Sequence, residues 1–216
     1  MTDPDSPPVV DDRRDGPLAD LQVVLMQVEV AGILGVLIGA FIVQFVGREL
    51  PCPLCLLQRM AMMLAAMGPL YLLGRVYAGR SVEPTAFATA YGMSVIGAAL
   101  GLLISSRQVL LHILPNDPGY GSAIMGMHLY TWADVVFLVV IAVSGLTMIL
   151  SGSLRVSARK GPAPWTVRAT QVAFLVVVAA NVVSTLVESG FNAFLPDNPT
   201  EYRLIDRGPD GAQKDS

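Results

Sequence analysis

An apolar block begins directly behind a pair of cysteines in the stretch PCPLCLLQRMAMMLAAMGPLYLL, residues 51–73. The apolar part is long enough to cross a bilayer as a helix. Cys52 and Cys55 are the only cysteines of the chain, and a Cys-x-x-Cys pair on one short turn is more often redox-active than structural. Arg59 follows Cys55 by one helical turn, on the same helix face. Together these features predict electron transfer between protein thiols and a molecule dissolved in lipid.

The composition is that of a membrane protein. Of the 216 residues, 53% are hydrophobic and only 14% are charged, and the apolar residues gather in long blocks. The formal net charge of -3 leaves no basic surface for nucleic acid. Residues 1–20 contain six aspartates and lack the pattern of a cleaved signal peptide, so we expect a short disordered tail there.

Five apolar blocks are long enough to span a bilayer as helices, which are the state that satisfies backbone hydrogen bonds in lipid. We therefore predict an all-α membrane protein, with a helical bundle over residues 21–187. The fifth block contains Asn181; if that block does not cross, the C-terminus moves to the other side of the membrane. The five blocks cover approximately residues 23–46, 56–73, 87–104, 132–150 and 167–187.

The distribution of lysine and arginine predicts the orientation of the bundle, because cytoplasmic loops carry an excess of both. One side would hold the residue 1–20 tail, the connection after the second block and the connection between the fourth and fifth blocks. The other side would hold the cysteines, the outer loop at 105–131 and the tail at 188–216, in a compartment where disulfides persist. The basic residues of the first side are Arg13, Arg14, Arg75, Arg80, Arg155, Arg159, Lys160 and Arg168.

The segment around the cysteines favours a reactive sulfur at Cys55. Pro51 and Pro53 place Cys52 in an extended or turn conformation, and the second helix should begin near Cys55. The free N–H groups and dipole of a helix N-terminus stabilise a thiolate there. Arg59 would add to this effect, and a charge at membrane depth is usually functional or paired, although snorkelling to the head groups is the simpler explanation.

Two other interpretations concern the residues of the outer loop. His112 and His128 are the only histidines and fall on the side of the cysteines, so a Cys2His2 zinc site is an alternative, although its spacing is wider than in compact fingers. Gln108 and His112 form an i, i+4 pair that could offer hydrogen bonds to a carbonyl-bearing head group. Ordinary solvation at the membrane interface explains this pair equally well.

Three motifs resemble the DsbB (disulfide bond formation protein B) family. They are Pro-Cys-x-Leu-Cys with Gln58-Arg59, then Arg107-Gln108, then the stretch GMHLYTW at 126–132. The resemblance implies an enzyme of the bacterial inner membrane that reoxidises a periplasmic thioredoxin-like protein, DsbA, and passes electrons to ubiquinone or menaquinone.

Carried over by position, the resemblance also implies roles for single residues. Cys52 and Cys55 would form the active disulfide, with Cys52 attacked from the aqueous side. Cys55 would face the quinone, and Arg59 would hold the negative charge that develops on the ring. Gln108 and His112 would contribute to the quinone site, and no metal is implied.

The chain departs from the family pattern in two places. The region from 107 to 131 contains no cysteine, whereas typical members carry a second pair there that meets DsbA first. The fifth block and the tail are additional. Either the partner thiol attacks Cys52 directly, or another protein supplies the relay, or turnover has been lost. A vitamin K epoxide reductase-like enzyme and a non-enzymatic metal-binding or scaffold protein are the alternatives.

Overall fold

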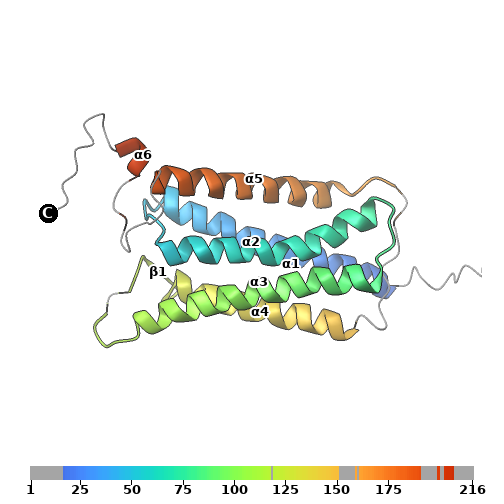
Figure 1. Cartoon of the computed structure of the whole chain (residues 1–216), viewed down its shortest axis with the longest axis horizontal. Coiled ribbons are helices and arrows are strands. Elements are labelled where there is room, and N and C mark those ends of the chain that lie inside the picture. The colour runs from blue at the N-terminus through green and yellow to red at the C-terminus, as the bar shows by residue number, and fades with distance from the viewer. Residues whose placement is uncertain are drawn as a thin grey trace, which may run out of the picture.

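The computed structural model describes residues 17–117, 119–150, 159, 161–190, 199 and 202–206. Five long helices dominate it, and a two-stranded antiparallel hairpin and one short helix complete it (Figure 1). The elements are α1 Pro17–Phe45, α2 Pro53–Tyr77, α3 Pro84–Leu111, β1 Ala123–Ile124, β2 Met127–His128, α4 Leu129–Leu150, α5 Trp165–Ser189 and α6 Arg203–Asp206.

The predicted all-α membrane bundle is confirmed, because all five long helices are long and apolar enough to span a bilayer. The fifth block forms α5 in spite of Asn181, whose side chain is turned inward and only 4% exposed. Helix α1 begins at Pro17, so the last four residues of the expected disordered tail are helical. Residues 1–16 of that tail lie outside the described residues.

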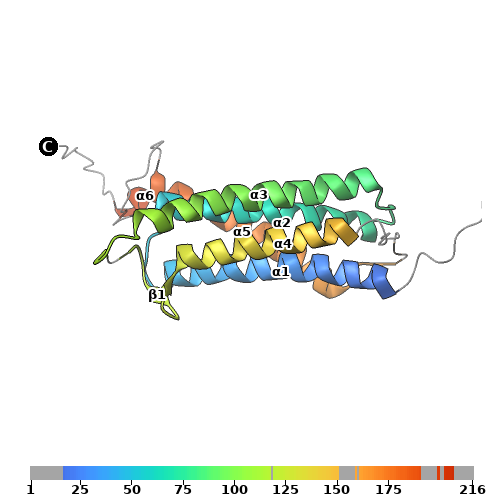
Figure 2. The same cartoon turned by 90° about the horizontal axis from the view of Figure 1, so that it is seen from below.

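Helix α2, which carries the cysteines, lies at the centre of the bundle. In the most apolar 18-residue stretch of α2, 67% of the residues are buried. In the corresponding stretches of the other four helices, 28–39% of the residues are buried. It packs against α3 and α1, while α4 packs on α3 and α5 on α1. The two views show the helices side by side, with the hairpin, α6 and the start of α2 at the same end (Figures 1 and 2).

Small residues allow α2 and α3 to approach closely. A Cβ atom at Gly97 of α3 would lie 2.7 Å from the backbone nitrogen of Ala65, and one at Gly68 of α2 would collide with the carbonyl oxygen of Ala90. The hydroxyl of Ser94 donates to the Ala65 carbonyl oxygen at 2.7 Å across the same contact. Such close backbone contact makes the α2–α3 pair a rigid support for the cysteines.

Candidate functional site

The cysteine pair caps the N-terminus of α2. Cys52 is the N-cap residue, with the extended conformation that its flanking prolines predict (φ -70, ψ 162), and Pro53 occupies the first helical turn. Cys52 and Cys55 form a disulfide, with 5.0 Å between their Cα atoms. The Cys55 N–H donates to the Sγ atom of Cys52 at 3.1 Å. The disulfide therefore lies at the positive end of the helix dipole.

The two sulfurs differ in their surroundings. Cys52 is only 4% exposed, whereas Cys55 is half-buried and lines a cavity. Cys52 is therefore poorly accessible to a thiol in solution in this arrangement. The role of Cys52 as the sulfur that a partner attacks stays a prediction.

A pair of glutamines lies against the disulfide. The Gln108 amide donates to Sγ of Cys52 at 3.2 Å and to Sγ of Cys55 at 3.7 Å. The Gln58 amide in turn donates to the Gln108 side-chain oxygen at 2.9 Å, and both side chains are buried. Since Gln58 occupies the oxygen of Gln108, the amide N–H groups of Gln108 are directed to the sulfurs.

Arg59 points into the bundle rather than to the head groups. It is 7% exposed, and its guanidinium donates to the Gln44 side-chain oxygen at 2.7 Å and to the Ala40 carbonyl oxygen at 3.1 Å. The same guanidinium lies 4.9 Å from the centroid of the Phe41 ring. The explanation that Arg59 snorkels is therefore wrong, because helix α1 provides the acceptors and the ring face that hold a buried cation.

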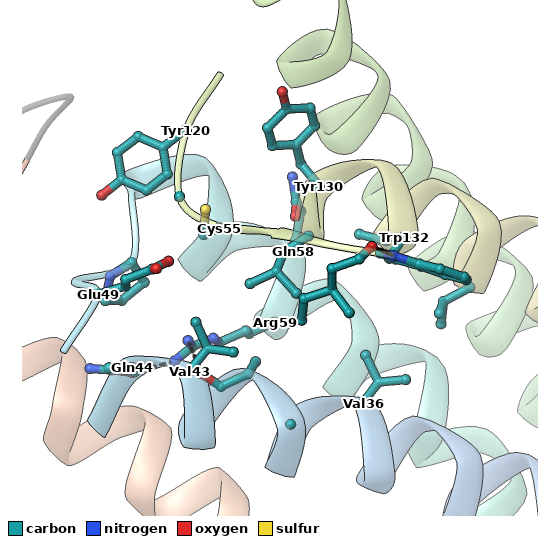
Figure 3. A pocket seen from close by; sticks show the side chains of 18 of the residues that line it. Val36, Val43, Gln44, Glu49, Cys55, Gln58, Arg59, Tyr120, Tyr130 and Trp132 are labelled. Carbon is teal, nitrogen blue, oxygen red and sulfur yellow. Dashed lines mark hydrogen bonds between the residues drawn. The ribbon is translucent and has the colours of Figure 1, made fainter. Parts of the chain in front are cut away.

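A cavity of about 370 Å³ opens between the start of α2, the second half of α1, the start of α4 and the outer loop. Figure 3 shows Cys55, Gln58 and Arg59 on one side of it, with Tyr120 and Trp132 among the residues around it. Apolar side chains make up most of the remaining wall, which is typical of pockets for flat organic molecules. They include Val36, Val43, Leu50, Met62, Ile124, Met125, Leu129, Ala133 and Val136.

The outer loop is tied to the segment that precedes the cysteines. The Tyr120 hydroxyl donates to the Leu50 carbonyl oxygen at 2.6 Å, and the Ser122 N–H donates to the Glu49 carboxylate at 3.0 Å. Burial raises the pKa of Tyr120, and the nearby charges of Glu188 and Glu49 raise it further. The phenol therefore keeps the proton that it donates to Leu50.

The hairpin β1–β2 completes the cavity wall. Met125 and Gly126 both have positive φ values, 51 and 81, as a two-residue turn between antiparallel strands requires. The Trp132 indole N–H donates to the Ile124 carbonyl oxygen at 3.0 Å. The indole thus has a partner in the outer loop, in addition to the position at the membrane interface that the sequence indicates.

Two predicted quinone-binding residues lie beside the cavity rather than on its wall. Gln108 contacts the disulfide, and His112 ends α3, where its Nδ1 atom lies 3.1 Å from the Asp117 carboxylate. Neither is among the residues that line the cavity. The N–H of Gly119 and the ring of His112 lower the pKa of Asp117. These contacts order the loop, and direct binding of a ring by Gln108 or His112 stays a prediction.

His112, His128 and the two cysteines are not arranged as the ligands of a metal site. The sulfurs pair with each other, and Nδ1 of His128 lies 3.1 Å from the Gly121 carbonyl oxygen. Within the part of the chain that the structure describes, no group of three or more His, Cys, Asp or Glu side chains is placed to hold a metal ion.

Sequence reasoning assigned no role to several polar residues of the site. Gln44 binds Arg59, Gln58 orients Gln108, and Tyr120 ties the loop to Leu50. Gln44 lies inside the first apolar block, and a polar side chain inside a span was the signal that could have found it.

Comparison with known proteins identifies related sequences. A sequence model of the family "Disulfide bond formation protein DsbB" matches residues 23–147. Two curated proteins named "Disulfide bond formation protein B", from Xanthomonas euvesicatoria pv. vesicatoria (strain 85-10) and Xanthomonas axonopodis pv. citri (strain 306), are each 40% identical over 85 residues. The match covers 38% of this chain and 46% of each relative, so the chain spans about half the length of these relatives. No solved structure matches significantly.

Proposed function

Since this chain belongs to the DsbB family, we propose that it is a thiol:quinone oxidoreductase of the bacterial inner membrane. It would reoxidise a DsbA-like thioredoxin-fold protein on the periplasmic side and pass the electrons to a membrane quinone, ubiquinone or menaquinone. One observation carries the proposal. The Cys52–Cys55 disulfide lies at the N-terminus of α2, and Cys55 and Arg59 both line an apolar cavity of about 370 Å³.

The thiol half of the reaction begins at Cys52. A partner thiolate bonds to Cys52 Sγ, the Cys52–Cys55 bond breaks, and Cys55 leaves as a thiolate. The second partner thiol then releases the partner as a disulfide, which leaves two thiols on this chain and moves two electrons. The α2 N-terminus and the Gln108 amide, 3.7 Å from Cys55 Sγ, stabilise the leaving thiolate.

The cavity fits the head group of a quinone. Its volume lies at the small end of ligand pockets, and its wall is largely apolar. The Nε atom of Arg59 is buried and has no hydrogen-bond partner among the described residues, so one donor of the guanidinium is left for a ligand. Cys55, Arg59, Tyr120 and Trp132 would hold the ring. When bound, a quinone supplies an acceptor for two electrons and two protons.

The chain's own residues prepare the cavity for that transfer. Arg59 lines the cavity, and its positive charge would stabilise negative charge on a bound ring. Tyr120 and the hairpin residues Ile124 and Met125 also line the cavity, and they would limit the access of water to a bound ring. Cys55 lines the cavity and is also half of the disulfide, so the group that would accept electrons from the partner would also face a bound ring.

The partner would meet Cys52 directly, since the chain carries only two cysteines. The buried position of Cys52 then requires the segment around Glu49 and Leu50 to move, together with the Tyr120 and Ser122 contacts that tie it to the outer loop. We propose this opening as the step that admits the partner.

The positions of the basic residues support a periplasmic cysteine end. Arg75 lies in the last turn of α2 and Arg168 in the first turn of α5. The Arg159 N–H donates to the Val76 carbonyl oxygen at 3.0 Å, and its side chain pairs with Asp20. These residues mark the end of the bundle opposite to the disulfide, where the excess of positive charge indicates the cytoplasm.

The test is reduction of a short-chain ubiquinone, followed by its ultraviolet absorbance. The purified full-length protein in detergent is mixed with a reduced DsbA-like protein. Wild type is expected to reduce the quinone, and Cys55→Ser to abolish reduction while keeping the helical content of wild type. Quinone reduction that persists in Cys55→Ser, or none in wild type at any partner concentration, would refute the proposal.

A further inference from the structure

The contacts of Arg59 continue into the C-terminal part of the chain, beyond the residues that match the family. Gln44 accepts from Arg59, and its amide donates to the Ser184 hydroxyl of α5 at 2.7 Å and to the Tyr202 hydroxyl at 3.4 Å. The family match ends at residue 147. Helix α5 and the residue that precedes α6 therefore contribute side chains to the Arg59 site.

Glu188 is a buried carboxyl group at the same place. It follows Ser184 by four residues on α5, one helical turn, and is 1% exposed. Neither of its carboxylate oxygens has a hydrogen-bond partner among the described residues. Glu188 and Arg59 attract each other electrostatically, and Tyr120 also experiences the charge of Glu188. Glu188 thus lies close to two residues that line the cavity.

Because Arg59 and Glu188 are both buried, their charges affect each other and the cavity strongly. An isolated charge in the interior is costly, and an opposite charge nearby offsets part of that cost. The Arg59 cation on its own would stabilise any anion in the cavity strongly. The charge of Glu188 acts on Arg59 with the opposite sign, and a nearby carboxylate would reduce this stabilisation.

We propose that Glu188 is a positioning residue of the redox site, the buried counter-charge that holds the Arg59 guanidinium and limits how strongly it stabilises a thiolate at Cys55. The inference rests on the proposed function in so far as that function gives Arg59 its role at the cavity. It makes α5 part of the redox site and not only an additional span. Two other ionisable groups interact electrostatically with this pair: Tyr202 acts on Arg59, and Tyr120 experiences the charge of Glu188 and also that of Glu49.

The first test is the pH titration of thiolate absorbance in the reduced full-length protein, without quinone or partner. Glu188→Gln removes the charge at nearly constant volume, so the first thiol is expected to ionise at a pH lower by about half a unit. Glu188→Asp is expected to return the curve toward wild type. Curves that coincide for wild type and Glu188→Gln would overturn the proposal.

Glu29→Gln is the matched control. Glu29 is another buried carboxyl, 8% exposed, and it accepts from Ser144. It lies 11 residues before Ala40 on α1, roughly 16 Å away along the helix. Its replacement is expected to leave the thiol titration unchanged. An equal shift in Glu29→Gln would show that loss of any buried carboxyl has this effect, and would also overturn the proposal.

A stability measurement covers the case in which Glu188→Gln folds poorly. Arg59→Gln and Glu188→Gln are each expected to lower the melting temperature in detergent, because each leaves a buried charge without its counter-charge. The drop in melting temperature of the double variant is expected to be smaller than the sum of the drops in the two single variants. Strictly additive losses would contradict the pairing. Neither measurement requires turnover, so a failed quinone assay would refute the proposed function and leave this result readable.

Discussion

Gln108 donates a hydrogen bond to the Sγ atom of Cys52 at 3.2 Å, although 56 residues separate them in the chain. The contact joins the end of α3 to the N-terminus of α2, and the same amide lies 3.7 Å from the Sγ atom of Cys55, the sulfur that would leave as a thiolate. Gln58 fixes the orientation of that amide at 2.9 Å. Sγ of Cys52 thus accepts hydrogen bonds from two helices, from Gln108 of α3 and from the Cys55 N–H of α2, and Cys52, Gln58 and Gln108 are all buried.

Gln108→Leu is expected to slow reduction of the disulfide by a small dithiol. The leaving thiolate loses a donor worth about 1.4 kcal/mol, which corresponds to roughly a tenfold lower rate. The rate is followed by quenching with a thiol-alkylating reagent and counting free cysteines. Gln22→Leu is the control, because Gln22 is also fully buried but belongs to α1 near its start. A rate unchanged in Gln108→Leu would contradict the assigned contact.

Arg59→Ala is expected to raise the apparent quinone KM by about tenfold, because the cavity loses its only positive charge among the lining residues. The KM of Arg59→Lys is expected to lie between those of wild type and Arg59→Ala, since a lysine keeps the charge but not the planar donor set. Arg75→Ala, at the opposite end of α2 where Arg75 donates to Tyr71 and Ser81, is the control. If Arg59→Ala leaves the KM unchanged, the role of Arg59 at the ring is wrong.

Tyr120→Phe is expected to make the disulfide more accessible to a hydrophilic reductant. The variant loses the 2.6 Å hydrogen bond to the Leu50 carbonyl oxygen, which ties the outer loop to the segment before Cys52. A several-fold faster reduction is the expected result. Tyr71→Phe, on α2 near its C-terminus, is the control, because Tyr71 instead accepts from Arg75. Equal rates in wild type and Tyr120→Phe would show that the loop does not limit access.

Because of Tyr120, the rate at which the disulfide is reduced is expected to change at alkaline pH. The pKa of Tyr120 is raised in the folded protein by burial and by the charges of Glu188 and Glu49. A raised pKa means that the loop contact is fully present below the ordinary tyrosine value near 10 and is lost as the pH rises through the folded value. Wild type is therefore expected to become more reducible above that pH, and Tyr120→Phe to show no such rise.

Gly68→Ala is expected to destabilise the bundle by about 1–3 kcal/mol. Its Cβ would collide with the backbone of Ala90 on α3, so that the two helices must separate. The melting temperature in detergent measures the effect. Gly74→Ala in the same helix is the control, since a Cβ at Gly74 meets nothing within 4 Å. A melting temperature equal in both variants would contradict the close α2–α3 contact.

The sequence predicted the helices well because long apolar blocks leave few alternatives in lipid. Its cysteine motif also predicted that the second helix begins near Cys55, whereas the helix begins at Pro53 and Cys52 is its N-cap. It did not show how each helix is rotated about its axis, and the rotation decides whether a polar residue near the end of a span meets water or a partner. Gln44 and Glu188 lie near the ends of their helices in the sequence, yet both side chains are buried, and Gln44 accepts from Arg59.

The outer loop was the least predictable part for a related reason. Its turn residues indicate where the chain reverses, but they do not indicate what it packs against. The contact of Tyr120 with Leu50 and that of Ser122 with Glu49 each join residues at least 70 positions apart. Such pairings depend on the assembled bundle and have no local pattern.

The central claim is that one cysteine pair connects a thiol partner to a membrane quinone. The most direct measurement is an anaerobic single-turnover experiment that counts partner thiols lost and quinone reduced, with full-length wild type and Cys55→Ser. The account predicts that two partner thiols disappear for each quinone reduced by wild type, and that Cys55→Ser reduces none. Loss of partner thiols without any quinone reduction in wild type would contradict it.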